Sequence, residues 1–468
     1  MNILLVRPKP HKESINLHSM MICEPLELEY LAARVEQLGH HADIVDLILE
    51  KRELEYFLAQ KKYHIAGFTS YLTHVDIVKD LSGRAHAFDP GMITLAGGVH
   101  AEVNPEDFDD PRIDLVVRAN AMTSLEPLLA LLEKTDLSDP ERRSGTLDAI
   151  RSAIPGVWQR GKARPPFETQ FPFSFPDRGK TRKYRKKYSY SYLSRCASIK
   201  TSFGCPYNCN FCFCTCITQK NYFERDLRDV IEEIKTIEEP NVYVVDDNFL
   251  LRRERVLEFC RLIEEESITK TFIIFGRADF VAKNPDVMKR LRDVGLHAIF
   301  VGIESFREND LASIGKQSSV AVNVKAIETI ESLGMSCYFG LIAMPDWERG
   351  DFDGAVNFLK RFKRPIINLQ PLTPLPGTDC YERYKDRLVI PRERHEVWDL
   401  AHLAIKPLKM APVDFYRNIL RVYYKTSAGL GMHLYILRKY GLEAYFRILR
   451  GLVTITGQYF KMIRDSKT

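Results

Sequence analysis

Short apolar segments alternate with helix-like amphipathic segments in two separate rounds along this 468-residue chain. In the first round, strand-like runs such as "NILLV" and "ADIVDL" are separated by segments such as "LELEYLAARVEQLG", whose apolar residues recur near helical spacing before a glycine. Short strands that alternate with helices form parallel sheets. We therefore expect residues 1–135 to form a doubly wound, Rossmann-like parallel sheet of five strands.

The second round contains six strand-like runs, among them "VYVVDDN", "FIIFGRA" and "AIFVGIES". Helical segments such as "RRERVLEFCRLIEEE" separate these runs. Six strand–helix units make three quarters of a closed eight-unit barrel. We therefore expect residues 193–385 to form a partial (β/α)6 barrel in an α/β protein. Functional groups should lie at the carboxyl ends of its strands.

Two further regions lack this alternation of strand-like and helix-like segments. Residues 136–192 are rich in proline, glycine, charge and aromatic side chains, which predicts a linker that lies against a surface. Residues 386–468 are basic, aromatic and amphipathic, which predicts a C-terminal helical domain. Arg and Lys alternate there with Leu, Ile, Tyr and Phe. This pattern is shared by a helical cap and by a surface that meets a membrane or an apolar substrate.

Composition narrows the class of protein. The chain is 45% hydrophobic and 28% charged, as soluble globular proteins are, and its net charge of +5 permits an anionic partner without requiring one. The first residues contain only a four-residue apolar run, and no run approaches the roughly 18 apolar residues of a spanning helix. We expect a cytoplasmic protein with reduced thiols and no nucleic-acid partner.

Five of the ten cysteines lie within "FGCPYNCNFCFCTC", directly after the first strand of the second round. Cys205, Cys209 and Cys212 have the spacing CxxxCxxC. Three thiolates on one loop can hold three irons of a [4Fe–4S] cluster and leave the fourth iron open. Zinc would favour four ligands in two pairs, and the sequence has neither a second CxxC nor an HxxxH. We expect these three cysteines to bind the metal and Cys214 and Cys216 to be bystanders.

The cysteine triad, its place after the first strand of a βα barrel and Phe211 before the third cysteine resemble the radical S-adenosylmethionine (SAM) superfamily. In that family the open iron chelates SAM, and reductive cleavage gives a 5′-deoxyadenosyl radical. The resemblance implies a [4Fe–4S] cluster, SAM and an external electron donor of flavodoxin or ferredoxin type. The SAM contacts that it implies are Phe211, Asp246, Asp247, Arg277, Glu304, Leu372, Thr373 and Pro374.

The resemblance also implies roles for these residues. Asp246 or Asp247 would accept from the methionine ammonium; the family's Gly-Gly-Glu is absent, so which aspartate acts stays open. Arg277 would pair with the SAM carboxylate. Glu304 would accept from the ribose hydroxyls, and 372–374 would line the adenine. Each also has a purely structural interpretation, as a helix cap for Asp247 and as ion pairs for Arg277 and Glu304.

The first round resembles the cobalamin-binding domain that precedes many radical SAM barrels, in "EPLELEYLAARVEQLGHHADIVDL", "IAGFTSYLTHVD" and "GGVHAEVNPEDF". This resemblance implies a corrinoid at the carboxyl ends of the strands. Its candidate contacts are Thr69, Ser70, Tyr71, Gly97, Gly98 and His100. The sequence has no DxHxxG, so we expect no histidine bound to cobalt. "RANAMTS" replaces the family's Gly-Glu-Gly-Glu, which weakens the argument for a bound nucleotide tail.

Together the two domains imply a cobalamin-dependent radical SAM enzyme that methylates an unactivated carbon. Cobalamin would carry a methyl group from one SAM, and a second SAM would supply the radical. No general acid or base is nominated, so no catalytic side chain is predicted. Two alternatives stay open: the same two-domain enzyme performing cyclisation, ring contraction or oxidation, and a non-catalytic iron–sulfur or zinc protein.

The substrate is a further expectation. "WDLAHLAIKPLKMAPVDFYRNILRVYYK" is similar to the corresponding region of hopanoid and isoprenoid-lipid methylases. A lipid substrate is therefore one candidate, and another small molecule, such as a natural product or a tetrapyrrole, is the other. The basic amphipathic end also fits a protein that visits a membrane surface.

Overall fold

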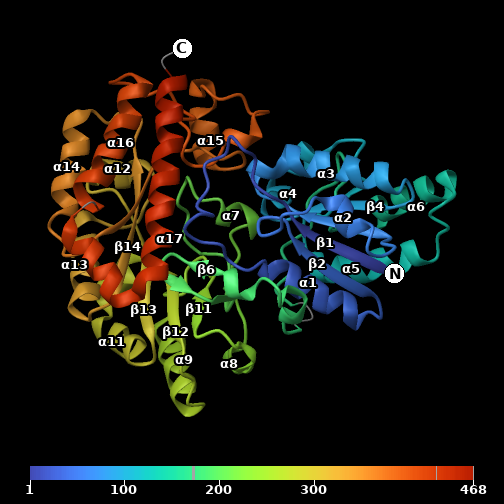
Figure 1. The fold of residues 1–468 in the computed structure, drawn as a ribbon, viewed down its shortest axis with the longest axis horizontal. Helices are drawn as coiled ribbons and strands as arrows, with labels where there is room; N and C mark the ends of the chain where they lie inside the picture. The colour runs from blue at the N-terminus through green and yellow to red at the C-terminus, as the bar shows by residue number, and fades with distance from the viewer. Residues whose placement is uncertain (171–173, 428, 467–468) are drawn as a thin grey trace. The chain divides into compact units, whose positions relative to one another are not determined.

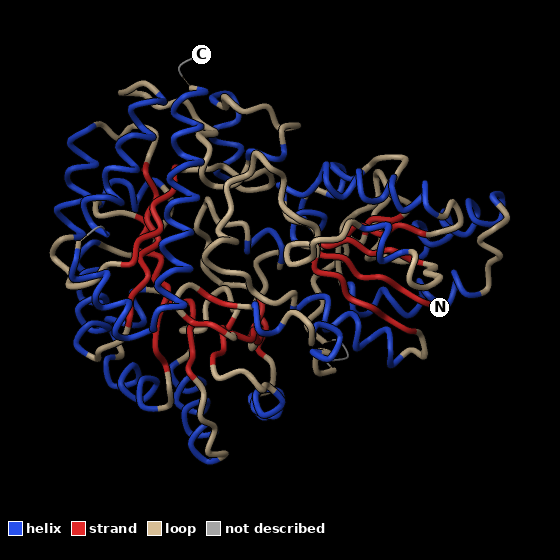
Figure 2. The backbone as a smooth tube through the Cα atoms, viewed as in Figure 1, coloured by secondary structure: helices blue, strands red, loops and turns tan. Residues whose placement is uncertain are grey.

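The computed structural model describes residues 1–170, 174–427 and 429–466, so 171–173 of the predicted linker lie outside the described residues. The chain forms two compact units (Figures 1 and 2). The first unit contains Met1–Ser14, Pro25–Arg185 and Arg392–Asp399, and the second contains Ile15–Glu24, Lys186–Pro391 and Leu400–Thr468.

The first unit is built on a five-stranded parallel sheet with the order β2-β1-β3-β4-β5. The strands are β1 (Asn2–Arg7), β2 (His41–Asp46), β3 (Ile65–Thr69), β4 (Ile93–Gly97) and β5 (Leu115–Val116). They coincide with the five apolar runs of the sequence, which confirms the predicted Rossmann-like sheet. The strand order reverses between β1 and β3, and ligands of such sheets bind beside that point.

Helices cover both faces of this sheet. They are α1 (Leu26–Gln37), α2 (Leu54–Leu58), α3 (Val75–Phe88), α4 (Val99–Val103), α5 (Ala121–Glu133) and α6 (Pro140–Ala153). Leu28 of α1, Leu128 of α5 and Ile150 of α6 pack into one core, whereas Leu54 and Val78 of α2 and α3 pack into another. The sheet is therefore buried on both sides, which explains its continuous apolar strands.

The second unit contains a six-stranded parallel sheet with the order β15-β14-β13-β12-β11-β8. Its strands are β8 (Cys196–Ile199), β11 (Asn241–Val244), β12 (Thr271–Gly276), β13 (Leu296–Glu304), β14 (Ser336–Ala343) and β15 (Ile366–Pro371). Consecutive strands of the chain are neighbours in the sheet, and β8 and β15 form its two edges. This arrangement confirms the predicted open, partial (β/α)6 barrel.

Helices pack on one face of the second sheet and shorter elements follow the strand ends. The helices are α8 (Leu227–Thr236), α9 (Arg253–Glu265), α10 (Ala278–Lys283), α11 (Pro285–Asp293), α12 (Glu308–Ser313), α13 (Val320–Ser332), α14 (Arg349–Leu359) and α15 (Asp379–Tyr384). The remaining short elements of this unit include α7 (Cys214–Ile217), β6 (Ser189–Tyr190), β7 (Leu193–Ser194), β9 (Ser202–Phe203) and β10 (Phe223–Glu224). Phe272 and Ile274 of β12 point into this helical core, and Ile273 between them points to the other face.

Two C-terminal helices, α16 (Pro412–Ser427) and α17 (Leu430–Asp465), complete the second unit and confirm the predicted helical region. Gly441, with φ +81°, bends α17. Before and just after the bend, Ile436 and Ile448 pack in a cluster with Ile273 and Ala298 on the second face of the sheet. Figure 1 shows α17 lying over these strands. No helix among the described residues is long and apolar enough to cross a membrane.

Candidate functional site

The cysteine loop follows β8 at the carboxyl edge of the second sheet. Gly204, with φ +78°, begins it, and a Cβ there would overlap the carbonyl oxygen of Asn221, so only glycine fits this turn. The Gly204 N–H donates to Asp247 Oδ2 at 2.9 Å, and the Cys212 N–H donates to the Cys209 carbonyl at 3.1 Å. The loop is therefore fastened to the end of β11.

The three predicted ligands do not share one electrostatic environment. Cys205, Cys209 and Cys212 are all partly buried. Burial raises the pKa of Cys205 and Cys209, and nearby Arg277 and Lys316 partly oppose that rise. A hydrogen bond from Cys214 is the main cause that lowers the pKa of Cys212 to about 7. Cys212 also raises the pKa of Cys205 and of Cys209.

The donor set fits an iron–sulfur cluster by its chemistry. Three thiols lie on one loop, Cys205 and Cys209 are near cations, and thiolates are the ligands that such clusters use. Among residues 1–170, 174–427 and 429–466, no three His, Cys, Asp or Glu side chains already converge as a metal site. The fit therefore rests on the donors and their spacing. When bound, the cluster supplies an electron to SAM.

The two aspartates after β11 have different surroundings. Asp246 is buried and accepts from the Thr201 N–H at 2.6 Å, the Thr201 hydroxyl at 2.6 Å and the Ser202 hydroxyl at 2.7 Å. Burial raises its pKa. Asp247 is more exposed and accepts from Gly204 and from the Cys214 thiol at 3.1 Å. Asp246 thus braces the end of β8, and Asp247 lies on the cysteine loop itself.

Arg277, at the end of β12, is buried against the same loop. Its guanidinium lies 3.6 Å from the centre of the Tyr207 ring, inside the CxxxCxxC sequence. Nε donates to Asp279 at 3.0 Å and Nη2 donates to the Gln317 carbonyl at 2.8 Å. These contacts fix the plane of the guanidinium. Sequence reasoning proposed Arg277 but missed Tyr207 and Gln317.

Glu304, the last residue of β13, adopts φ +62°, a left-handed conformation that is uncommon for a residue with a side chain. Its Oε1 lies 2.9 Å from Nζ of Lys316. A Cβ at Gly302 would lie 2.9 Å from Lys316 Nζ and would overlap the Glu304 carboxylate, so these two side-chain ends would have to move. Sequence reasoning also missed Lys316, whose local signal was only the turn-forming Gly315 that precedes it.

The turn 313–317 connects these parts. The Asn210 N–H donates to the Ile314 carbonyl at 3.2 Å, and the Asn210 side chain donates to the Ser313 carbonyl at 3.0 Å. The same turn contributes the Lys316 and Gln317 groups described above. The cysteine loop, Arg277 and Glu304 are therefore held by one short segment between α12 and α13.

The remaining predicted SAM contacts lie beside the sheet. Leu372, Thr373 and Pro374 are buried and continue β15, with the Leu372 N–H donating to the Ala343 carbonyl at 3.0 Å. Phe211 packs against the main core. The structure therefore brings the predicted cysteines, Asp247, Arg277 and Glu304 to one edge of the sheet, and it places 372–374 at the end of the last strand.

The predicted cobalamin contacts lie at the carboxyl ends of β3 and β4 in the first unit. Thr69 donates to Glu27 at 3.3 Å, and Ser70 donates to the Gly97 carbonyl at 2.7 Å. Gly98 has φ +96°, and a Cβ there would lie 2.7 Å from the Ser70 nitrogen. The bare backbone of Gly98 therefore serves the contact between two strand ends, a use that the sequence did not indicate.

Tyr71 and His100 differ in exposure. The Tyr71 ring is 57% exposed, whereas His100 is 1% exposed. His100 Nε2 lies 2.8 Å from Asp107, its Nδ1 is buried without a partner among the described residues, and burial lowers its pKa. His395, in the 3-10 turn η6 (His395–Val397), has its ring centre 6.5 Å from that of His100. Sequence reasoning missed His395, because it is almost 300 positions away along the chain.

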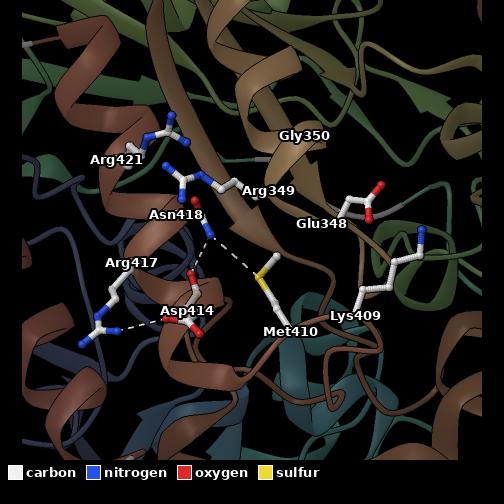
Figure 3. Close-up of a pocket in the computed structure, with 9 residues that line it drawn as sticks. All are labelled: Glu348, Arg349, Gly350, Lys409, Met410, Asp414, Arg417, Asn418 and Arg421. Atoms are coloured by element: carbon white, nitrogen blue, oxygen red, sulfur yellow. Dashed lines mark hydrogen bonds and ion pairs between the residues drawn. The ribbon is translucent and has the colours of Figure 1, made fainter.

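A cavity of about 630 Å³ lies between the start of α14 and α16 in the second unit (Figure 3). Arg349, Lys409 and Arg421 line it, as do Asp414 and Arg417, which form an ion pair at 3.0 Å. None of the predicted site residues lines this cavity. We assign it no role in the chemistry of the strand ends.

Both domain types of the chain match known family models. Residues 199–359 match the radical SAM superfamily, and residues 15–129 match the B12 binding domain. The first match begins at the end of β8 and includes the cysteine loop. The second includes the strands that carry the predicted cobalamin contacts in the first unit.

Two relatives align with most of the chain. It is 28% identical to the hopanoid C-3 methylase of Methylococcus capsulatus over 443 residues, which cover 92% of this chain and 81% of that one. It is 25% identical to the bacteriochlorophyllide d C-8(2)-methyltransferase of Chlorobaculum tepidum, over 83% of this chain and 82% of that one.

A solved structure has the same fold. The cobalamin-dependent SAM radical enzyme OxsB, with aqua-cobalamin and SAM bound, superposes with a TM-score of 0.70. The match covers 98% of this chain and 72% of that chain, at 14% identity. This similarity confirms the α/β architecture.

Proposed function

Because the chain belongs to the radical SAM superfamily and carries a B12 binding domain, we propose that it is a methyltransferase that places a methyl group on an unactivated carbon of a lipid. Its cofactors are a [4Fe–4S] cluster, SAM and cobalamin. The observation that carries the proposal is that one chain contains both a cysteine loop at the first strand end of a partial barrel and, in its first unit, a five-stranded sheet of cobalamin-binding type. In the reaction, a hydrogen atom leaves an sp3 carbon, and a methyl group from SAM takes its place.

Within the second unit, the residues at the sheet edge have separable roles. Cys205, Cys209 and Cys212 would hold the cluster. Asp247 is better suited than Asp246 to accept from the SAM ammonium, because all three hydrogen bonds to Asp246 come from the end of β8. Arg277 would bind the SAM carboxylate with a guanidinium already oriented by Tyr207 and Gln317.

Glu304 and Lys316 form the next part of the proposed SAM site. The Glu304 carboxylate would accept from the ribose hydroxyls through the oxygen that Lys316 leaves available. The ammonium of Lys316 lies close enough to Cys209 to lower the pKa of that thiol. Thus Lys316 would stabilise both the carboxylate and the thiolate. Buried 372–374 and Phe211 would supply an apolar wall for the adenine.

In the first unit, the proposed cobalamin contacts are the groups at the ends of β3 and β4. The hydroxyls of Thr69 and Ser70 and the backbone at Gly97 offer hydrogen-bonding groups, and the exposed Tyr71 ring offers an apolar face. His100 would contribute through Nδ1, which has no partner among the described residues, because Nε2 already contacts Asp107. Gly98 acts indirectly by letting Ser70 approach β4.

The lipid is proposed from the relatives and from the C-terminal helices. A relative at 28% identity is named as a hopanoid methylase, and α16 and α17 carry the basic, aromatic sequence of this region. An external donor of flavodoxin or ferredoxin type would reduce the cluster. We also propose that the protein works at a membrane surface, where its substrate would be dissolved.

The test is an anaerobic incubation of the cobalamin-loaded protein with a reductant, methyl-labelled SAM and a bacterial lipid extract. We expect label in an apolar product together with 5′-deoxyadenosine. Label in a water-soluble product instead would keep the methyl transfer and exclude the lipid. Deoxyadenosine without any labelled product would favour cyclisation, ring contraction or oxidation. Absence of deoxyadenosine under strong reduction would contradict radical chemistry altogether. The control is the Cys209→Ala variant, which should yield neither product.

A further inference from the structure

The helix α17 is apolar on two opposite sides after its bend at Gly441. One side packs into the second unit through the buried residues Ala444, Ile448, Tyr459 and Met462. The other side carries five large apolar side chains that are between 37% and 66% exposed: Leu442, Phe446, Leu449, Val453 and Phe460. With 3.6 residues per turn, these five positions fall within about 60° of the helix circumference. We call them the outer stripe.

The packing of the second unit explains the buried side of α17 but not the outer stripe. Single exposed apolar side chains are ordinary on protein surfaces. Five such side chains on one side of the helix, spread over about 27 Å of its length, form a continuous apolar band. The band is water-facing in this structure, and no described helix, α17 included, is suited to cross a membrane.

Charge indicates what kind of surface fits the outer stripe. The helix contains six Lys or Arg residues and only two Asp or Glu residues. Arg450 and Lys461 are exposed, and neither has an ion-pair partner among the described residues. An amphipathic helix with an apolar stripe flanked by cations is the form that lies in the interface of an anionic bilayer.

We propose that the outer stripe docks the protein on the surface of a membrane that contains anionic lipids. The helix axis would lie parallel to the bilayer, with Phe446 and Val453 among the acyl chains and Arg450 and Lys461 at the headgroups. The short bend at Gly441 lets the earlier part of α17 remain packed on the sheet.

A second copy of the chain is a poorer occupant of the outer stripe. A band about 27 Å long and about 10 Å wide would bury roughly 270 Å² per copy, against roughly 800 Å² in a stable interface. Pairing would also bring two cationic helices together. An anionic lipid surface attracts the cations, and binding to it grows with the apolar area inserted without needing a complementary protein face.

This docking surface deepens the proposed work at a membrane surface, but it does not depend on the proposed methyl transfer, because vesicle binding can be measured without turnover. The experiment is flotation of the full-length holoprotein with vesicles of phosphatidylcholine alone or phosphatidylcholine mixed with phosphatidylglycerol. We expect the protein to float with the mixed vesicles and to detach as the ionic strength rises.

Three variants make the test specific. Leu442→Gln/Phe446→Gln/Val453→Gln removes three of the five side chains of the outer stripe and should weaken vesicle binding by about tenfold or more. Arg450→Gln/Lys461→Gln removes the flanking cations and should reduce the preference for phosphatidylglycerol. Phe88→Gln, an exposed apolar residue on α3, is the matched control and should bind as the parent does.

Circular dichroism and iron content establish that each variant is folded, and if the triple variant fails this check, the single variant Val453→Gln replaces it. The proposal is overturned if the parent stays unbound, if it binds both vesicle types equally, or if the variants bind as the parent does. Stripe-dependent dimers in light scattering, without flotation, would instead assign the outer stripe to a second copy.

Discussion

The ammonium of Lys316 lies 2.9 Å from the carboxylate of Glu304, and the two side chains are only 8% and 13% exposed. Glu304 ends β13 in a left-handed conformation, and Lys316 follows twelve residues later in the turn that also holds Asn210 and Arg277. The pair therefore joins the strand end to the cysteine loop. A buried positive charge at this position acts on every anionic group that the proposed cofactors bring there.

Replacing Lys316 by methionine should affect both the Glu304 carboxylate and the proposed cofactor site. The Glu304 carboxylate would be left buried and unpaired, a change that commonly costs about 3–5 kcal/mol of stability. We expect SAM to bind at least about tenfold more weakly, which corresponds to about 1.4 kcal/mol. The reduction potential of the cluster should become more negative, because a positive charge favours the reduced state.

The matched variant is Lys316→Arg, which keeps the charge and should restore most of the SAM affinity and of the potential. Equilibrium SAM binding and a redox titration followed by electron paramagnetic resonance measure the two effects. An unchanged potential in Lys316→Met, or equal losses in both variants, would show that the residue only fills space.

Alanine substitutions of the five clustered cysteines should fall into two groups by their effect on cluster binding. Substitution of Cys205, Cys209 or Cys212 by alanine should abolish cluster binding, because three irons need three thiolates. Cys214→Ala and Cys216→Ala should keep an iron content near that of the parent after anaerobic reconstitution. The Cys214 thiol lowers the pKa of Cys212, so its loss should slow reconstitution at neutral pH without preventing it. Iron loss in either of the last two variants would overturn this division.

Acid should loosen the attachment of α17 to the sheet. His297, at the start of β13, has its Nε2 2.7 Å from the Tyr440 hydroxyl of α17, and burial lowers its pKa to about 4. Its pKa in the unfolded chain is about 6.5, so the unfolded chain binds more protons between these values. The contribution of His297 to stability is therefore present above pH 6.5 or so and is lost as the pH falls toward about 4.

Thermal unfolding midpoints measured across this pH range test the role of His297. We expect the midpoint of the parent to fall more steeply with acidification than that of His297→Gln, which cannot be protonated. Tyr440→Phe should lower stability at neutral pH but keep the acid dependence, because burial is the main cause of the shift. Parallel curves for the parent and His297→Gln would refute the assignment.

Two glycine-to-alanine substitutions in the first unit should have opposite effects on stability. Gly98→Ala would force a side chain into a left-handed backbone and place its Cβ 2.7 Å from the Ser70 nitrogen, so we expect a loss of about 1–3 kcal/mol. Gly145→Ala in α6 meets open space and should stabilise the helix by up to about 1 kcal/mol. Cobalamin binding, followed by absorbance, should weaken only in Gly98→Ala. Equal stability of the two variants would contradict the close approach of β3 and β4.

Both sheets could be predicted from the sequence because each strand is a short apolar run. "FIIFGRA" and "AIFVGIES" predict β12 and β13, and the residue after such a run lies at the carboxyl edge, which is how Arg277 and Glu304 could be proposed. Parallel order then follows from the crossover helices. The cysteine spacing needed no structure at all.

The partners of these residues could not be predicted, because they come from loops distant in sequence. Nothing in "SIGKQ" shows that Lys316 turns back to Glu304, or that Gln317 accepts from Arg277. Two neighbouring aspartates look alike in "VDDN", and only the fold shows Asp246 buried beneath Thr201 and Ser202. Likewise, the amphipathic sequence of α17 predicts one apolar face, whereas the structure shows two, one that is packed and one that is exposed.

Methyl transfer by cobalamin-dependent radical chemistry would leave a distinctive ratio of products. The holoprotein is incubated anaerobically with reductant, methyl-labelled SAM and substrate, and three products are quantified by mass spectrometry. We expect one S-adenosylhomocysteine and one 5′-deoxyadenosine for each labelled product, because one SAM gives the methyl group and a second gives the radical. S-adenosylhomocysteine and labelled product without deoxyadenosine, or deoxyadenosine without labelled product, would contradict this expectation.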